Sequence, residues 1–102
     1  MATIEGSDIK KVVVACDAGM GSSVLLTTQL KKSLSPYGVT VEHSPVDRIP
    51  DDADLVLCHS GLVDRARHRV DDTVVVAFQM FLGDPAFTRV EAAIRDGGTL
   101  AD

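Results

Sequence analysis

The chain has 102 residues, of which 45% are hydrophobic and only 4% aromatic, and this composition suits one small domain with an aliphatic core. Its formal net charge of -5 excludes a typical nucleic-acid binder, because such proteins carry a basic surface. No apolar run approaches the roughly 20 residues that cross a bilayer. Residues 1–10 lack the apolar region of a signal peptide, so we expect a cytoplasmic protein without membrane insertion.

Strands and helices alternate along the predicted structure. Residues 1–9 are expected to be a polar, flexible lead-in to a single domain that spans residues 1–102. Apolar, β-branched runs predict strands, and leucines at every fourth position predict the first helix. In chain order, we expect a strand at 10–15, a helix at 22–34, strands at 39–43 and 53–58, a helix at 61–70, a strand at 73–78 and a helix at 85–96.

This alternation predicts a three-layer α/β fold with a parallel sheet between helices. Right-handed crossovers leave few topologies, and we expect a Rossmann-like sheet whose four strands, numbered along the chain, lie in the order 2-1-3-4. The switch point then falls between the first and third strands, where such sheets bind ligands beyond their carboxyl ends. Cys16 follows the first strand and His59 follows the third, so both belong to this edge.

Cys16 opens a short loop between the first strand and the first helix, and the loop continues through Asp17, Ala18, Gly19, Met20, Gly21, Ser22 and Ser23. Glycines allow backbone N–H groups to turn inward, and the helix N-terminus adds partial positive charge. Such a cradle favours a thiolate and can hold the three oxygens of a phosphoryl group. We therefore predict that Cys16 takes up phosphate and that the loop residues bind it.

Several side chains around this loop allow two interpretations. Asp17 either points outward and favours the turn, or it repels the phosphoryl group and makes transfer easier. Cys58 closes an apolar strand without a glycine loop, so core packing is favoured. His59 either makes a hydrogen bond at the strand end or lies near the phosphate. No His, Cys, Asp or Glu cluster has the spacing of a metal site, so we expect no metal and no cofactor.

Two further groups are candidate surfaces for partner proteins. The first is a basic cluster of the second predicted helix, made of Arg65, Arg67, His68 and Arg69. A solvated helix end is the favoured interpretation of this cluster, and a docking patch for an acidic partner is the alternative. The second is an apolar group made of Met20, Phe78, Met80, Phe81 and Leu82. Core burial is the default for two or three of the four residues from 78 to 82, and any exposed remainder would join Met20 in a docking rim. For Met20 itself, packing against neighbouring helices is an equal alternative.

The loop from Cys16 to Ser23 resembles the active-site loop of the enzyme IIB component of the bacterial phosphoenolpyruvate-dependent sugar phosphotransferase system, in its mannitol-type branch. The resemblance continues at residues 54–56, 59–66 and 78–82. It implies that a phosphohistidine IIA protein phosphorylates Cys16, which then passes the group to a sugar or hexitol taken up by a separate membrane IIC permease. It also implies that Ser23 is the foremost hydroxyl contact. Ser60 stands where the mannitol-type pattern has an arginine.

Two other functions compete with a carrier. A low-molecular-weight tyrosine phosphatase shares the central-strand cysteine and a similar phosphate loop. It needs an arginine six positions after the cysteine to clamp the phosphoryl oxygens, and Ser22 occupies that position here. Asp84 and Pro85 superficially offer its acid, but a helix N-cap and first-turn proline account for them. The other alternative is a non-catalytic domain whose loop only senses an anion.

Overall fold

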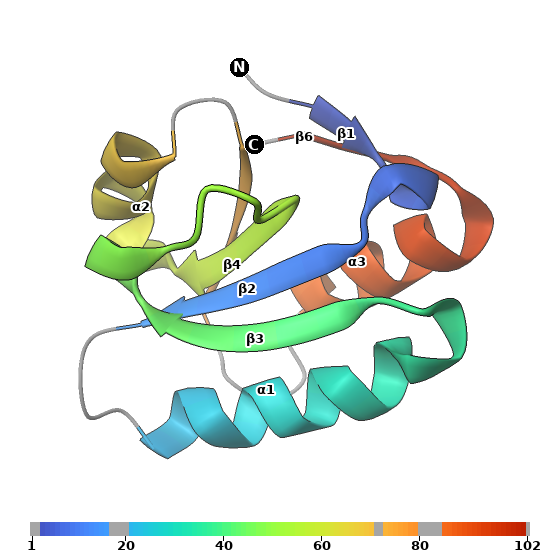
Figure 1. Cartoon of the computed structure of the whole chain (residues 1–102), viewed down its shortest axis with the longest axis horizontal. Helices are drawn as coiled ribbons and strands as arrows, with labels where there is room; N and C mark the ends of the chain where they lie inside the picture. The colour runs from blue at the N-terminus through green and yellow to red at the C-terminus, as the bar shows by residue number, and fades with distance from the viewer. Residues whose placement is uncertain (1–2, 17–20, 71–72, 80–84, 102) are drawn as a thin grey trace.

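A four-stranded parallel sheet forms the centre of the protein. The computed structural model describes residues 3–16, 21–70, 73–79 and 85–101. The strands lie in the order β3-β2-β4-β5, and their bounds are Lys11–Cys16 for β2, Thr40–Pro45 for β3, Leu55–His59 for β4 and Val74–Phe78 for β5 (Figure 1). All three neighbouring pairs are parallel. This order equals the predicted 2-1-3-4, so the sheet topology is confirmed.

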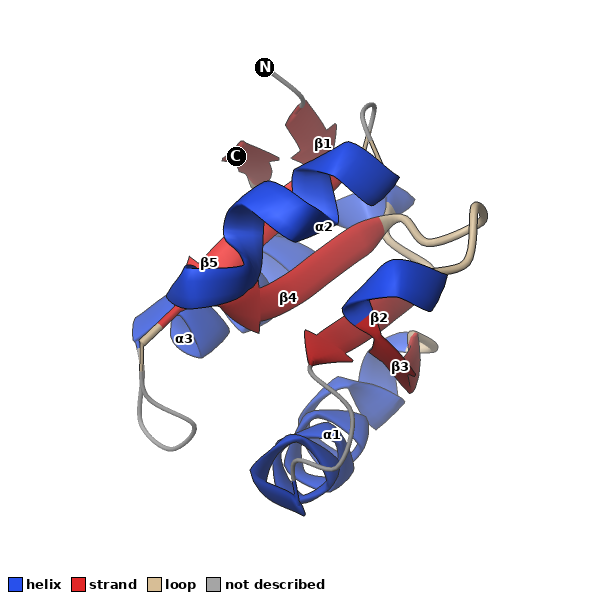
Figure 2. Ribbon diagram, turned by 90° about the vertical axis from the view of Figure 1, so that its left-hand side faces the viewer, coloured by secondary structure: helices blue, strands red, loops and turns tan. Residues whose placement is uncertain are grey.

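Helices cover both faces of the sheet, which confirms the three layers. The helices are α1 (Gly21–Leu34), α2 (Val63–Arg69) and α3 (Pro85–Asp96). Side chains of α1 and α3 share one buried cluster, whereas α2 belongs to a second cluster on the opposite face. Figure 2 shows α2 in front of β4 and β5, with α3 behind them. The second helix was predicted at 61–70, but its first turn is instead the tighter 3-10 helix η4 (Ser60–Leu62), and α2 begins after it.

The central strand β2 packs on both faces. Val12 and Val14 belong to the cluster under α1 and α3, whereas Val13 and Ala15 belong to the cluster under α2. All four are buried, which explains why the sequence of this strand is continuously apolar rather than alternating. The predicted leucine stripe of α1 meets the first cluster, and its members are Leu26, Leu30 and Leu34.

Glycines lie at the ends of two helical segments. The 3-10 helix η2 (Ser35–Tyr37) follows α1 and closes at Gly38, whose φ is 71°. Gly97 follows α3 with a φ of 76°, and the N–H of Gly98 donates to the carbonyl of Ala93 at 3.0 Å. This is the usual way to end a helix with a left-handed residue, which glycine adopts without a steric penalty.

The segment between β3 and β4 contributes to the core, although the sequence predicted only a loop at residues 47–52. It contains the 3-10 helix η3 (Val46–Arg48), and both Val46 and Ile49 are buried in the cluster under α2. The hydroxyl of Ser44 lies 3.1 Å from the carbonyl oxygen of Pro45 and 3.0 Å from that of Arg48, which stabilises the corner. Two isolated apolar residues have no periodicity, so their burial could not be predicted.

Residues 3–5 and 99–101 form a small antiparallel sheet, so the described part of the expected flexible lead-in, residues 3–9, has regular structure. Strand β1 (Thr3–Glu5) pairs with β6 (Thr99–Ala101), and Figure 1 shows the two strands side by side. The 3-10 helix η1 (Gly6–Asp8) follows β1, and its Gly6 N–H donates to the carbonyl of Gly98 at 2.6 Å. Ile9 is buried in the main core. Strands of three residues are too short for a periodic signal.

Candidate functional site

The predicted nucleophile lies at the carboxyl edge of the sheet. Cys16 is the last residue of β2, and its Cα pairs with Pro45 of β3. On the other side, Ala15 pairs with Cys58, so His59 is the next residue of β4 at the same edge. The strands β2, β3 and β4 therefore end together, on the side where α1 begins (Figure 1). The structure thus brings Cys16 and His59 to neighbouring strand ends, as the topology predicted.

The rest of the predicted phosphate loop leads directly into α1. Gly21 is the first residue of this helix, and Ser22 and Ser23 follow in its first turn. Asp17, Ala18, Gly19 and Met20 lie outside the described residues, as do Met80, Phe81, Leu82 and Asp84. The first turn of α1 contains no acidic residue, so no carboxylate there offsets the positive end of the helix dipole. A 14-residue helix that begins five residues after Cys16 suits anion binding.

Contacts with Gly61 and Phe78 hold His59 at the end of β4. Its Nδ1 accepts a hydrogen bond from the N–H of Gly61 at 3.2 Å, which caps η4. Its ring meets Phe78 edge to face, with the ring centroids 6.1 Å apart and the planes at 89°. The predicted strand-end hydrogen bond is therefore confirmed. The side chain is half-buried, so it is neither a core residue nor fully solvated.

Cys58 belongs to the core, as predicted. Its side chain is fully buried among the residues under α2, and it has no disulfide partner. Burial raises the pKa of this thiol to about 11, and the positive charge of Arg67 offsets only part of that effect. A neutral, buried thiol is a poor nucleophile. Cys58 is therefore a packing residue and not a second reactive centre.

The basic cluster of α2 forms ion pairs with the segment that follows β3. Arg65 lies 3.1 Å from a carboxylate oxygen of Asp47, and Arg69 lies 3.1 Å from one of Asp51. Because both pairs are exposed, they contribute little to stability. They do neutralise part of the positive charge, which favours the solvated helix end over a docking patch for an acidic partner.

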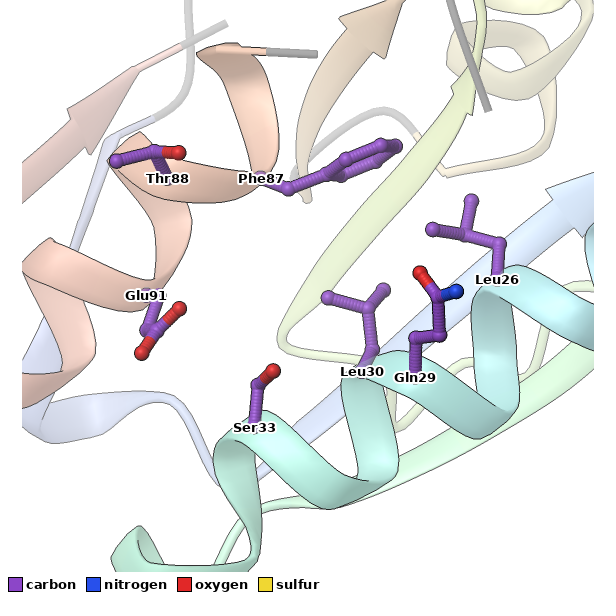
Figure 3. Close-up of a pocket in the computed structure, with 7 residues that line it drawn as sticks. All are labelled: Leu26, Gln29, Leu30, Ser33, Phe87, Thr88 and Glu91. Atoms are coloured by element: carbon purple, nitrogen blue, oxygen red, sulfur yellow. The ribbon is translucent and has the colours of Figure 1, made fainter. Parts of the chain in front are cut away.

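A shallow groove between α1 and α3 was not predicted from the sequence. It encloses about 170 Å³ and is lined by Leu26, Gln29, Leu30, Ser33, Phe87, Thr88 and Glu91. Figure 3 shows the two leucines of α1 facing the ring of Phe87 across this groove. The ring of Phe87 also contacts the ring of Phe78, and the two ring centroids lie 5.1 Å apart. The groove is smaller than ordinary small-molecule sites of about 300 Å³ or more.

The described part of the chain contains neither a metal-binding cluster nor a membrane-spanning helix. Within residues 3–16, 21–70, 73–79 and 85–101, no three or more His, Cys, Asp or Glu side chains gather as a metal site would require. None of the helices in these ranges combines the length and apolar character that a membrane span needs.

The geometry defines a class: parallel α/β proteins with a cysteine at the carboxyl edge of the central sheet and a helix that begins five residues later. The family model described as "PTS system, Lactose/Cellobiose specific IIB subunit" matches residues 11–90. The match covers most of the chain, so the protein belongs to this family of phosphotransferase-system IIB components. The resemblance seen in the sequence is thereby confirmed, and the phosphatase alternative receives no support.

Curated relatives agree with this family. A mannitol-specific EIICB component of Geobacillus stearothermophilus is 35% identical over 81 residues, which are 78% of this chain and 17% of the relative. A mannitol-specific cryptic EIICB component of Escherichia coli (strain K12) is 37% identical over 81 residues, again 78% of this chain and 17% of the relative. A mannitol-specific EIICBA component of the same strain is 35% identical over 85 residues, which are 80% of this chain and 13% of the relative.

The chain therefore spans less than a fifth of the length of these curated relatives. The family description names lactose and cellobiose, whereas the names of the relatives specify mannitol. Family membership by itself thus identifies the IIB component and does not identify the sugar.

Proposed function

We propose that this chain is a phosphoryl carrier of the sugar phosphotransferase system, and that residues 1–102 form a single IIB domain. In this function a IIA protein that carries a phosphohistidine donates its phosphoryl group to Cys16. Cys16 then delivers the group to a sugar or hexitol that enters through a membrane IIC permease. The supporting observation is the position of Cys16 at the end of the central strand β2, five residues before the start of α1, in a chain of the IIB family.

The first transfer breaks one bond and forms one. The thiolate of Cys16 attacks phosphorus, the N–P bond of the phosphohistidine breaks, and an S–P bond forms. The donor imidazole leaves with the electron pair of the broken bond. Backbone N–H groups at the start of α1 and in the preceding loop would hold the three phosphoryl oxygens as charge moves between donor and sulfur.

The second transfer returns the cysteine to its starting state. A hydroxyl oxygen of the sugar attacks phosphorus, the S–P bond breaks and an O–P bond forms. The proton of that hydroxyl balances the thiol that is regenerated. Phosphocysteine plus alcohol thus give cysteine plus phosphate ester, and the transfer requires no metal in its stoichiometry.

The proposed roles of the loop residues follow from their places in the chain. Cys16 is the nucleophile, and the residues that bind the phosphoryl group are Asp17, Ala18, Gly19, Met20, Gly21, Ser22 and Ser23. Ser23 in the first turn of α1 would supply a hydroxyl donor in addition to the backbone amides. His59 occupies the adjacent strand end.

The proposed substrate is a mannitol-like hexitol, because the relatives named above are mannitol-specific components. Ser60 is the exposed first residue of η4 and replaces the arginine of the mannitol-type pattern. A panel of mannitol, other hexitols, lactose and cellobiose, offered with membranes that contain the permease, would identify the sugar. Preferential discharge of the phosphorylated chain by lactose or cellobiose would contradict the mannitol-like assignment.

The central test is phosphorylation of the purified chain. The protein is incubated with phosphoenolpyruvate, the general phosphotransferase proteins and a mannitol-type IIA protein, and its intact mass is measured. We expect a gain of one phosphoryl group in the wild type and in Cys58→Ala, and no gain in Cys16→Ser. Phosphorylation of Cys16→Ser, or none of the wild type, would contradict the carrier function. Anion binding without any mass gain would instead favour the sensing alternative.

A further inference from the structure

We propose that His59 donates a hydrogen bond from its Nε2–H to the phosphoryl group carried by Cys16. This inference rests on the proposed carrier function and adds a side-chain contact to it. Three features of His59 support this contact: its position in the sheet, the face to which its ring is attached and the tautomer that the backbone imposes.

The strand register brings His59 to the level of Cys16. Ala15 and Cys58 are partners across β2 and β4, so the next residues of these parallel strands are Cys16 and His59. Neighbouring strands of a sheet lie about 4.8 Å apart. Both residues are the last of their strands, so the sheet continues past neither of them. A group bonded to Cys16 at this edge is therefore within reach of a side chain at position 59.

The ring of His59 is attached to the face on which α1 begins. Phe78 is the register partner of His59 on β5, and the two rings meet edge to face. Phe78 is buried in the cluster that α1 and α3 share, as are the leucines of α1. The leucines show that α1, the helix that follows Cys16 in the chain, packs on this same face. His59 is thus placed beside the strand end at Cys16, on the face covered by α1 and away from α2.

The backbone selects the tautomer of the imidazole. Because Nδ1 accepts the N–H of Gly61, the neutral ring must carry its proton on Nε2. A histidine fixed in this way presents a donor to the phosphoryl oxygens and keeps its acceptor nitrogen occupied. Hydrogen bonds from such a donor to an anionic oxygen are stronger than neutral ones. The contact with Phe78 restricts the ring further, so little rotational freedom is lost when the bond forms.

The alternative role of His59 is purely structural, as the N-cap of η4. The two roles predict opposite orders for two conservative variants. His59→Asn retains a good cap but lacks the reach of Nε2. His59→Gln retains an N–H donor at about the position of Nε2, and glutamine is a poorer cap than asparagine. If His59 is only a cap, the Asn variant should have the higher kcat/KM for phosphorylation. If His59 contacts the phosphoryl group, the Gln variant should have the higher kcat/KM.

The experiment measures kcat/KM for phosphorylation of each variant by the phosphorylated IIA protein. We expect His59→Asn to lower kcat/KM by about 10- to 100-fold, the effect of losing a hydrogen bond to a charged group. We expect His59→Gln to retain at least tenfold more activity than His59→Asn. The matched controls are His68→Asn and His68→Gln on the exposed side of α2, which should match the wild type. Urea unfolding of every variant reports any loss of stability separately.

Nuclear magnetic resonance supplies a readout that a structural role would not change. A long-range ¹H–¹⁵N spectrum of the unphosphorylated protein should show the His59 proton on Nε2. Phosphorylation of Cys16 should shift the Nε2–H signal and slow its exchange with water, while the signals of His68 stay in place. A proton on Nδ1, or a His59 signal that does not respond to phosphorylation, would overturn the inference.

The outcomes separate this inference from the function on which it rests. If the wild type gains no phosphoryl group on Cys16, the carrier function fails and the inference fails with it. If the wild type is phosphorylated but His59→Asn equals or exceeds His59→Gln, His59 is only a cap. The carrier function then stands and the hydrogen bond to the phosphoryl group is rejected.

Discussion

The two cysteines of the chain occupy different parts of the sheet. Cys16 ends the central strand at the edge where α1 begins, whereas Cys58 lies one residue short of the end of β4 and points into the core under α2. The proposed chemistry belongs to the first, and burial suppresses the reactivity of the second. Both statements can be tested on single residues.

Alkylation should distinguish the buried thiol from an exposed one. In Cys16→Ser the only remaining cysteine is Cys58, whose raised pKa of about 11 leaves very little thiolate near neutral pH. We expect iodoacetamide at pH 8 to modify native Cys16→Ser at least about 100-fold more slowly than the same protein in urea, since two pKa units correspond to a factor of about 100. Rapid modification of the native variant, followed by mass, would contradict the burial of Cys58.

Alkaline pH should destabilise the fold through the same thiol. Its pKa is about 11 in the folded protein and near the ordinary value of 9.0 in the unfolded chain, so the unfolded chain loses its proton first as the pH rises. The stabilisation is complete below pH 9 and decreases up to about pH 11. Between pH 7.5 and pH 10 we expect the wild type to lose about 1.4 kcal/mol more free energy of unfolding than Cys58→Ala. Equal losses in urea titrations would refute this prediction.

At the scale of elements, the start of β2 depends on a carboxylate from the segment before β4. Asp54 accepts hydrogen bonds from the backbone N–H groups of Lys10 and Lys11, at 2.9 and 3.0 Å. The N–H of Asp54 donates in return to the carbonyl of Lys11 at 3.0 Å. These bonds tie together the starts of the two strands whose ends carry Cys16 and His59. Contacts at the opposite edge of the sheet therefore help to fix the strand register that aligns Cys16 with His59.

Removing this carboxylate should destabilise the fold. We expect Asp54→Ala to lower the free energy of unfolding by about 1–3 kcal/mol, because it leaves two backbone N–H groups without their acceptor. Asp54→Asn keeps one carbonyl oxygen and should lose less. Asp52→Ala is the matched control, since it removes only an exposed ion pair with the Lys11 ammonium. Equal stability of the Ala variants at 52 and 54 in urea titrations would show that the strand tie contributes nothing.

At the scale of the whole molecule, the two ends of the chain close over one side of the fold. The carbonyl of Gly98 accepts the N–H of Gly6, and β1 pairs with β6 beyond this bond. Gly6 lies so close to α3 that an added Cβ would be 1.7 Å from the carbonyl oxygen of Ala93. No side chain fits there unless the backbone moves, so the position requires glycine.

This close approach predicts a large effect of a single methyl group. We expect Gly6→Ala to destabilise the protein by about 3 kcal/mol, at the upper end of ordinary overpacking. Gly98→Ala is the matched control, because its Cβ would lie 3.6 Å from the nearest atom of Ala93 in ordinary contact. The free energies of unfolding of both variants can be compared by urea titration. A Gly6→Ala variant as stable as Gly98→Ala would show that η1 does not pack against α3 in solution.

The predictable parts of the fold are those with a local signal. Leu26, Leu30 and Leu34 repeat at helical spacing, and they are the buried stripe of α1. The apolar run of β2 is buried on both faces, which is typical of a central parallel strand. Strand order followed from the alternation of strands and helices, because few right-handed topologies satisfy it. These signals alone predict that Cys16 and His59 lie at one edge of the sheet.

By itself, the sequence determined the class of fold, the central position of the cysteine strand and the resemblance to IIB components, because each depends on residues close together in the chain. Only the tertiary structure decided which partners distant residues meet. The pairing of β1 with β6, the burial of Val46 and Ile49, and the contact of His59 with Phe78 are of this kind. Such contacts depend on how separate elements pack against each other, and this packing leaves no periodic pattern in a single segment.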